Sequence, residues 1–194
     1  EYVGGTAKFY DNNFILLEGP KANTITLPNP ASGAQDFHHG AAWDGRYLYC
    51  VLYGGTGAKI IGYDLDNGTT TATIVIEQFM NNPGATYAIE YAEGHLYTVT
   101  DGKVSQYKLD GKNITHVQTS GNILNSIEAQ AITYDGSYLW ITQNAQNVYK
   151  VNLDCTLEAT ITTGYPPNNT GWGWNGQNIN AVNYQTGEIY IVRT

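Results

Sequence analysis

The chain has 194 residues, which is enough for one domain with a sizeable core. Only 13% of its residues are charged, about half the share in an average soluble chain, and 17 acids against 9 bases give a net charge of −8. That charge repels phosphate backbones and anionic lipid headgroups, and no apolar run approaches the roughly 18 residues of a spanning helix, so neither nucleic-acid binding nor membrane insertion is expected.

Residues 1–39 predict short strands that precede the regular part of the chain. These strands are expected around Thr6–Asn12, Asn13–Glu18 and Thr24–Leu27. The chain begins at Glu1 and not at Met, as is expected of a processed or trimmed form.

One pattern recurs from Gly40 to the C-terminus at intervals of about 40 to 50 residues. Each copy is an alternating strand, a turn that contains Gly and a second alternating strand, which is typical of a β-hairpin. The copies begin at Gly40, Ala88, Ala131 and Ala181. Two more strands follow each of the first three hairpins, at residues 59–65 and 71–76, 103–109 and 113–119, and 147–153 and 157–162. Repeated four-stranded antiparallel sheets predict the blades of a β-propeller.

These repeats resemble those of NHL-type and quinoprotein-like propellers. Units of those families run through a Gly/Ala–apolar–x–Tyr/Trp–Asp–Gly strand and a Leu–Tyr–Val strand, and this chain carries a similar pattern at 40–49, 88–97, 131–140 and 181–192. The resemblance covers the chain from about residue 40 onward. It implies blade architecture and is nearly silent on activity, because such repeats serve enzymes, adhesins and scaffolds alike.

The spacing of the copies predicts an all-β fold, a four-bladed β-propeller in a single domain. Its blades are expected at approximately 40–87, 88–130 and 131–180, with a last blade made of 181–194 and 1–39. In that last blade an N-terminal strand would pair with residues 189–192 and close the ring. Residues 7–16 also match the beginning of a blade, so the alternative is a five-unit piece of a larger propeller. A related alternative is a homo-oligomer or polymer, in which the N-terminal strands complete a neighbouring subunit by strand addition.

Motifs for catalysis or metal binding are missing from the sequence. It holds no HExxH, CxxC or GxSxG motif, no Gly-rich phosphate loop and no pair of carboxylates within one loop. We therefore expect no metal site, no cofactor and no catalytic residue, and a protein that is not an enzyme. Cys50 and Cys155 occupy different repeat positions, which favours two unpaired thiols over a disulfide.

Aromatic residues recur at two positions of the repeat. Because the recurrence is fixed, it indicates packing between blades more than ligand recognition. The first set is Trp43, Tyr91, Tyr134 and Tyr184, and the second is Tyr49, Tyr97, Trp140 and Tyr190.

Residues 164–175 form a predicted loop without an equivalent in the other repeats. It holds Tyr165, Trp172 and Trp174 among Gly, Asn and Pro residues, and aromatic rings beside amides suit a sugar ring or a protein hot spot. Plugging of the channel mouth is the competing interpretation. First-strand positions would line the channel beneath this loop, so the other candidate ligand-binding residues are His38, His39, Tyr87, Gln130 and Asn180. Sequons add Asn67, Asn113 and Asn168 as candidate glycosylation sites.

These features together predict a non-enzymatic structural or interaction module that is extracellular or displayed at a surface. A subunit of a surface fibre, an adhesin or a virion appendage would fit the low charge and the Tyr-, Asn-, Thr- and Gly-rich composition. Its expected partners are other protein subunits or surface glycans. A carbohydrate-binding lectin is the first alternative, and a propeller hydrolase or lyase is a less favoured one.

Overall fold

A computed structural model describes most of the chain. The described residues are 4–8, 24–28, 37–53, 58–66, 71–81, 84–124, 129–143, 147–162, 169–174, 176–183 and 189–193. All their regular structure is β-strand, and none of the described segments forms a helix that could cross a membrane.

Seventeen strands follow one another in the described part of the chain. The N-terminal pair and the first blade comprise β1 (Gly4–Lys8), β2 (Thr24–Pro28), β3 (Phe37–Trp43), β4 (Tyr47–Tyr53), β5 (Lys59–Asp64) and β6 (Thr73–Phe79). The second and third blades comprise β7 (Thr86–Ala92), β8 (His95–Thr100), β9 (Lys103–Asp110), β10 (Asn113–Thr119), β11 (Ala129–Tyr134), β12 (Leu139–Gln143), β13 (Asn147–Val151) and β14 (Leu157–Thr162). The C-terminal sheet comprises β15 (Asn169–Trp174), β16 (Asn178–Asn183) and β17 (Ile189–Arg193).

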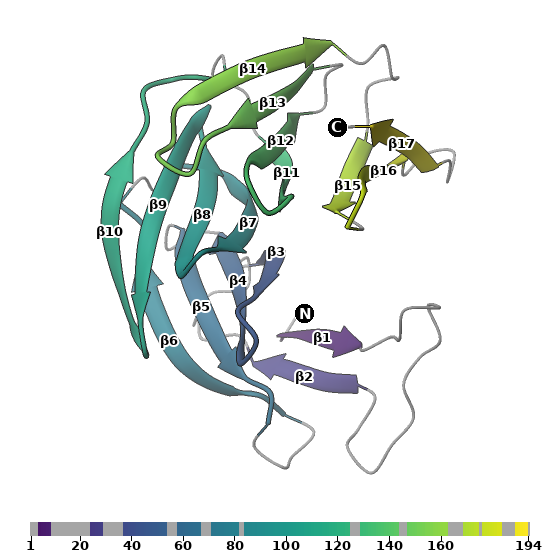
Figure 1. Cartoon of the computed structure of the whole chain (residues 1–194). Coiled ribbons are helices and arrows are strands. Elements are labelled where there is room, and N and C mark those ends of the chain that lie inside the picture. Colours follow the sequence, from purple (N-terminus) through teal and green to yellow (C-terminus); the bar gives the residue numbers. More distant parts are fainter. Residues whose placement is uncertain are drawn as a thin grey trace.

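The strands form antiparallel sheets that succeed one another around an arc (Figure 1). The first, second and third blades have four strands each in chain order, β3–β6, β7–β10 and β11–β14, as the repeat predicts. The C-terminal sheet has the three strands β15–β16–β17, and β1 and β2 form a separate N-terminal hairpin. The first strand of each sheet contacts the first strand of the next, from β3 through β7 and β11 to β15, so these are the inner strands of the arc. This arrangement of four-stranded sheets is propeller-like, as predicted.

The fourth repeat begins earlier than the sequence pattern indicated. We expected its first strand near Ala181, but residues 178–183 form the second strand of the C-terminal sheet and β15 is the first. Gly176 ends the turn after β15 with a φ of 92°, matching the 97° of Gly45 and Gly136 in the first and third blades. The true fourth copy of the aromatic–Asp/Asn–Gly turn is therefore Trp174–Gly176.

The predicted closure of the last blade is not among the described strand pairs. Strand β17 pairs with β16, and β1 pairs with β2 and not with residues 189–192. The N-terminal hairpin lies instead beside the first blade, where the Ala72 amide donates to the Thr26 carbonyl at 2.9 Å and the Tyr63 hydroxyl donates to the Pro28 carbonyl at 2.9 Å. This is the order of units expected for the alternative prediction, a five-unit arc. The third candidate strand, Asn13–Glu18, lies outside the described residues.

Every inner strand carries a register irregularity near its beginning. The shifts fall between His39 and Ala42, between Thr86 and Ile89, between Ala129 and Ala131, and between Asn169 and Gly171. In the first of them Gly40 has a φ of 55°, and a Cβ added there would lie 3.0 Å from the Tyr87 carbonyl oxygen and the Ile89 amide nitrogen. Glycine therefore permits the close approach of β3 to β7.

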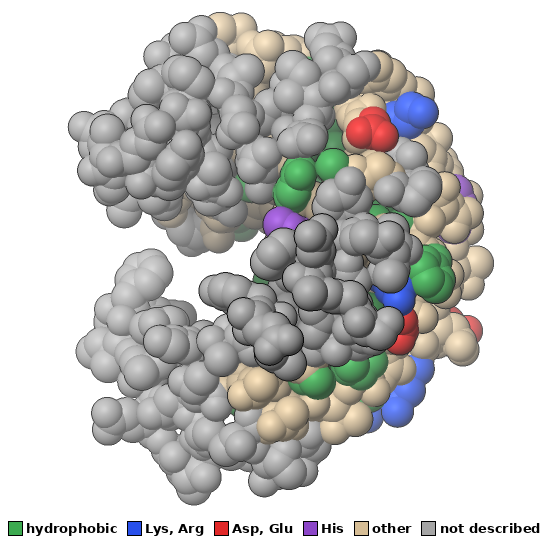
Figure 2. Space-filling model, turned by 180° about the vertical axis from the view of Figure 1, so that it is seen from behind, with side chains coloured by type: hydrophobic (Ala, Val, Ile, Leu, Met, Phe, Trp, Pro, Cys, Tyr) green, Lys and Arg blue, Asp and Glu red, His purple; other side chains and the backbone are tan. Residues whose placement is uncertain are grey.

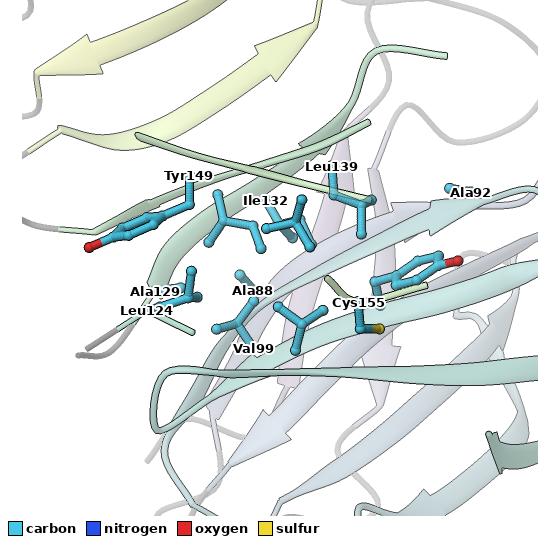
Figure 3. Close-up of a cluster of buried hydrophobic side chains, with 13 residues drawn as sticks. Ala88, Ala92, Val99, Leu124, Ala129, Ile132, Leu139, Tyr149 and Cys155 are labelled. Carbon is cyan, nitrogen blue, oxygen red and sulfur yellow. The ribbon is translucent and has the colours of Figure 1, made fainter. Parts of the chain in front are cut away.

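The core is divided among the interfaces between successive sheets. One cluster joins the second and third blades and contains Val99, Ile132, Leu139, Tyr149 and Cys155, and Figure 3 shows its side chains lying between the strands. Other clusters join the first to the second blade, the third blade to the C-terminal sheet, and β2 to the first blade.

The second set of recurrent aromatics packs as predicted in the three complete blades. Tyr49, Tyr97 and Trp140 are exposed by 0%, 0% and 3%. Their equivalent in the C-terminal sheet is Asn180 and not Tyr190, because Gly173 pairs with Asn180 as Ala42 pairs with Tyr49. The prediction of Tyr190 for this set is wrong because the fourth repeat was taken out of phase.

Candidate interaction surface

One aromatic position recurs at or next to the end of each inner strand. Its four members pair with an apolar residue on the neighbouring strand in the same register. The pairs are Trp43–Leu48, Tyr91–Leu96, Tyr134–Leu139 and Trp174–Ile179. The sequence pattern had placed Tyr184 in this set, but Tyr184 lies outside the described residues and Trp174 holds the fourth position.

Three of these aromatic residues pack against the preceding blade. Tyr91 lies against the cluster between the first and second blades, Tyr134 against the cluster between the second and third, and Trp174 against Trp140 and Val148 of the third. All three are partly buried. The prediction that this position serves packing between blades is confirmed for Tyr91 and Tyr134.

Hydrogen bonds join the same aromatic positions to the preceding blade. The Tyr134 hydroxyl donates to Glu93 Oε1 at 3.3 Å, and the Trp174 amide donates to Thr133 Oγ1 at 3.2 Å. Thr133 immediately precedes Tyr134 in β11. Thr133, the residue before the recurrent aromatic of the third blade, therefore faces the inner strand of the next sheet.

Trp43 is the exception, because 48% of its surface is exposed. The row that carries Trp43 faces the N-terminal hairpin: β1 contacts β3, and β2 packs on Leu48 and Tyr63 of this row but leaves the indole half exposed.

The turn that follows Trp43 is held rigidly by Asp44. Its Oδ1 accepts the Arg46 amide at 2.7 Å and the Tyr47 amide at 2.6 Å, and its Oδ2 accepts the Tyr49 hydroxyl at 2.7 Å. Burial of Tyr49 and this bond to Asp44 both raise the pKa of the Tyr49 phenol. Trp43 is thus presented by an ordered backbone.

The third blade repeats this turn with Asp135. Its carboxylate accepts the Ser137 amide at 2.8 Å, the Tyr138 amide at 2.7 Å and Trp140 Nε1 at 2.7 Å. Partial burial opposes ionisation of Asp135, but the bonds from Trp140, Tyr138 and Ser137 outweigh it and lower the pKa of the carboxyl. Both aspartates therefore serve as turn caps.

The C-terminal sheet, at the other end of the arc from the β1–β2 hairpin, presents a second exposed apolar side chain. Cross-strand pairing places Gly173, Asn180 and Ile191 in one row on the face turned away from Trp174 and Ile179. Gly173 is exposed, with nothing within 4 Å of a Cβ built on it, and Ile191 is 57% exposed. We call this row the Ile191 surface. The side of β3 that carries Trp43 is called the Trp43 surface.

The second blade carries a carboxylate at the position before the aromatic. Glu90 Oε1 accepts the Tyr91 amide at 2.9 Å. Burial raises the pKa of Glu90 to about 7, and hydrogen bonds from the backbones of Tyr91 and Tyr134 lower it only in part. Glu90 therefore joins the inner strands of the second and third blades.

The structure brings together two of the predicted channel residues. The rings of His39 and Tyr87 meet edge to face, with their centroids 4.8 Å apart, and burial lowers the pKa of His39. Asn180 was expected on an inner strand, but it lies on β16, the second strand of the C-terminal sheet. His38 and Gln130 belong to β3 and β11, but their side chains lie outside the described residues.

The two tryptophans of the predicted loop belong to strand β15. Trp172 pairs with Ala181 and Trp174 with Ile179, so the loop prediction is wrong for residues 169–174. Trp174 ends its strand, whereas His39 and Tyr87 lie near the beginning of theirs, so these candidates do not form one site. The side chain of Trp172 and all of Tyr165 lie outside the described residues.

The remaining predicted groups have simple environments. Cys50 and Cys155 are unpaired and buried, as favoured, and burial raises the pKa of each thiol to about 12. Asn113 is exposed at the beginning of β10, whereas Asn67 and Asn168 fall outside the described residues. Within the described ranges no three His, Cys, Asp or Glu side chains gather as a metal site would need.

Comparison with known proteins identifies a fold and no family. No protein-family model matches the chain, and a search of curated proteins finds no significant match. Among solved structures, the Cps50 (Swd1) β-propeller domain of Myceliophteria thermophila matches with a TM-score of 0.60 and 13% identity, over 87% of this chain and 59% of that one. Glutaminyl cyclase of Myxococcus xanthus matches with a TM-score of 0.60 and 13% identity, over 88% of this chain and 81% of that one.

A third match is the WD40 domain of Toxoplasma gondii coronin, with a TM-score of 0.57 and 11% identity, over 83% of this chain and 46% of that one. These likenesses show that the chain has an all-β propeller fold. They do not distinguish the NHL or quinoprotein type from other propellers. The chain spans 59% of the Cps50 domain and less than half of the coronin domain.

Proposed function

We propose that the chain is a non-enzymatic interaction module, a building unit of a larger protein assembly displayed outside cells. A surface fibre, an adhesin or a virion appendage is the kind of assembly it would serve. The observation that carries this proposal is that two large apolar side chains on different sheets stay exposed, Trp43 by 48% and Ile191 by 57%.

The Trp43 surface favours association. The β1–β2 hairpin covers Leu48 and Tyr63 of this side of the first blade, but the indole of Trp43 stays 48% exposed. An exposed aromatic residue on a rigid turn loses little conformational freedom on binding, which favours affinity.

The low charge of the chain supports the same proposal. Figure 2 shows Lys, Arg, Asp and Glu side chains only at scattered places among the described residues of the face in view. A surface with few charged groups costs less to desolvate when another protein covers it.

The acidic groups described at the inner strands have structural partners that account for them. Asp44 and Asp135 cap turns, and Glu90 accepts backbone amides between two blades. These roles support an interaction module over an enzyme.

Carbohydrate binding is the second candidate function. The exposed indole of Trp43 beside the polar Asp44–Arg46 turn is an observation that favours it, because sugar rings stack on such faces. A glycan array would test it. Binding that is lost in Trp43→Ala and kept in Phe79→Ala would establish a lectin, whereas an array without any signal would contradict it.

The size of the native particle tests the assembly proposal. The chain, extracted under non-denaturing conditions from the cells or particles that produce it, should sediment well above the 21.2 kDa of one copy. A native species of one chain and nothing else would overturn the proposal.

A further inference from the structure

We infer that Asn113 carries an N-linked glycan in the native protein. The inference deepens the proposed function and rests on it, because a chain displayed outside cells crosses a membrane, where the enzymes that glycosylate asparagine act. It joins the sequon Asn113–Ile114–Thr115 to the place that the fold gives these three residues.

The sequon begins directly after the turn that joins β9 to β10. Asp110 pairs with Asn113, so the turn consists of Gly111 and Lys112, and Gly111 has the positive φ of 60° that so tight a turn requires. All four of these residues are exposed. The asparagine is thus presented at the tip of a short hairpin with a defined conformation.

Alternation along β10 turns the two reactive positions of the sequon outward. Ile114 is buried and packs, with its cross-strand partner Leu109, in the cluster between the first and second blades. Because successive side chains of a strand point to opposite faces, Asn113 and Thr115 share the other face. Both are exposed. The amide that accepts the sugar and the hydroxyl that the sequon requires therefore lie on one exposed face, and the buried isoleucine fixes their direction.

The position of β10 in the blade leaves room for a bulky sugar. It is the outermost strand of the second blade, so no strand of its sheet lies beyond it (Figure 1). Lys108, which pairs with Thr115, is exposed as well. The strand belongs to neither the Trp43 surface nor the Ile191 surface, so a glycan on Asn113 leaves both free to meet other subunits.

The modification transfers a sugar to the side-chain amide of Asn113. The Nδ2 atom forms a bond to the anomeric carbon of a sugar that a lipid carries through a phosphate group. The bond between that carbon and the phosphate oxygen breaks, and the lipid phosphate leaves with the electron pair. The amide gives up one proton to a base of the transferring enzyme, and no oxidant or reductant is needed.

Peptide mass spectrometry of the chain from the cells or particles that produce it tests the inference. Proteolytic peptides that contain residues 113–115 should carry the added mass of a glycan, and fragmentation should place that mass on Asn113. A native chain in which these peptides have only the unmodified mass would overturn the inference.

Three substitutions, expressed in the same cells, test whether the sequon directs the modification. Asn113→Gln removes the acceptor, and Thr115→Ala keeps the acceptor but removes the hydroxyl, so each should lose the glycan at this site completely. Thr115→Ser is the matched control, because it keeps the hydroxyl and should keep the glycan. Since both positions are exposed, each variant should melt within about 2 °C of the unmodified chain purified from a host without the transferring enzyme. A mass that stays on Asn113 in Thr115→Ala, or is lost completely in Thr115→Ser, would contradict sequon-directed glycosylation.

The same native preparation separates this inference from the proposed function. A particle much larger than 21.2 kDa whose Asn113 is unmodified would overturn the glycan and leave the assembly proposal standing. A native species of one chain that carries the glycan would overturn the assembly proposal and support the glycan.

Discussion

The Tyr134 position and the Trp43 position are the same place in the repeat with opposite surroundings. Tyr134 has a complete blade before it, packs into the cluster around Tyr97 and donates to Glu93. Trp43 has the same strand register and a well-capped turn, yet nearly half of its surface is exposed. The local structure of a repeat is set by its own residues, whereas the burial of its interface depends on where it stands in the array.

The largest effect should come from the centre of a complete interface. Tyr97 is fully buried, donates to the Leu153 carbonyl at 3.1 Å and accepts Gln106 Nε2 at 2.9 Å. Tyr97→Ala should lower the free energy of unfolding by about 3–5 kcal/mol, measured by urea denaturation. Tyr97→Phe, which keeps the ring, should cost only about 1 kcal/mol. Similar losses in both variants would show that ring packing is not what holds these blades together.

The next effect is a pH dependence at the same interface. The pKa of Glu90 is raised from 4.5 to about 7 in the folded protein, so the folded state binds its proton more tightly than the unfolded chain does. The contribution of Glu90 to stability is fully present below about pH 4.5 and is lost as pH rises through about 7. That loss should be on the order of 2–3 kcal/mol.

Glu90→Gln gives the control for this pH dependence. The amide has a similar shape and does not titrate, so the fall in melting temperature between pH 5 and 8 should be smaller in the variant. Parallel melting curves for both proteins across that range would contradict the assignment to Glu90.

A smaller effect is expected at the turn cap. Asp135→Ala removes the acceptor for two backbone amides and for the Trp140 indole, and should cost about 1–2 kcal/mol. Chemical denaturation would measure it. Asp154→Ala is the comparison, because Asp154 caps an exposed turn through Thr156 and should cost less. If Asp154→Ala lowered the free energy of unfolding as much as Asp135→Ala or more, the hydrogen bond from Trp140 to Asp135 would add nothing to stability.

The smallest effect on folding should be at Trp43. At concentrations that favour the monomer, Trp43→Ala should change the free energy of unfolding by less than about 1 kcal/mol. Tyr134→Ala should cost more than that because it leaves a gap in a formed interface. It should cost less than Tyr97→Ala because Tyr134 is only partly buried. A loss at Trp43 as large as that at Tyr134 would show that the two positions do not differ as described.

The sequence predicted the fold because period and alternation are local properties. Nearly all strands of the three complete blades lie where the pattern placed them. The fourth repeat was taken out of phase because Gly171–Trp172–Gly173–Trp174 has the composition of a loop, and Gly is disfavoured in strands. The match of Trp174–Asn175–Gly176 to Trp43–Asp44–Gly45 was the signal that could have corrected it.

The candidate interaction surface could not be predicted from the repeat. Recurrence of Trp43 with Tyr91 and Tyr134 indicated a packing residue, and in two of those places that interpretation is confirmed. Exposure of the third depends on the unit before the first blade, the β1–β2 hairpin, which covers Leu48 and Tyr63 but not all of the indole; the repeat pattern of Trp43 itself does not reveal this.

Solvent access to Trp43 in the associated protein tests the central claim most directly. Hydroxyl-radical footprinting with mass spectrometry reports the oxidation of individual tryptophans in the purified chain and in the native particle. The account predicts that Trp43 is oxidised readily in the purified chain and becomes protected, like the buried Trp140, in the particle. Oxidation of Trp43 that stays high in the native particle would contradict it.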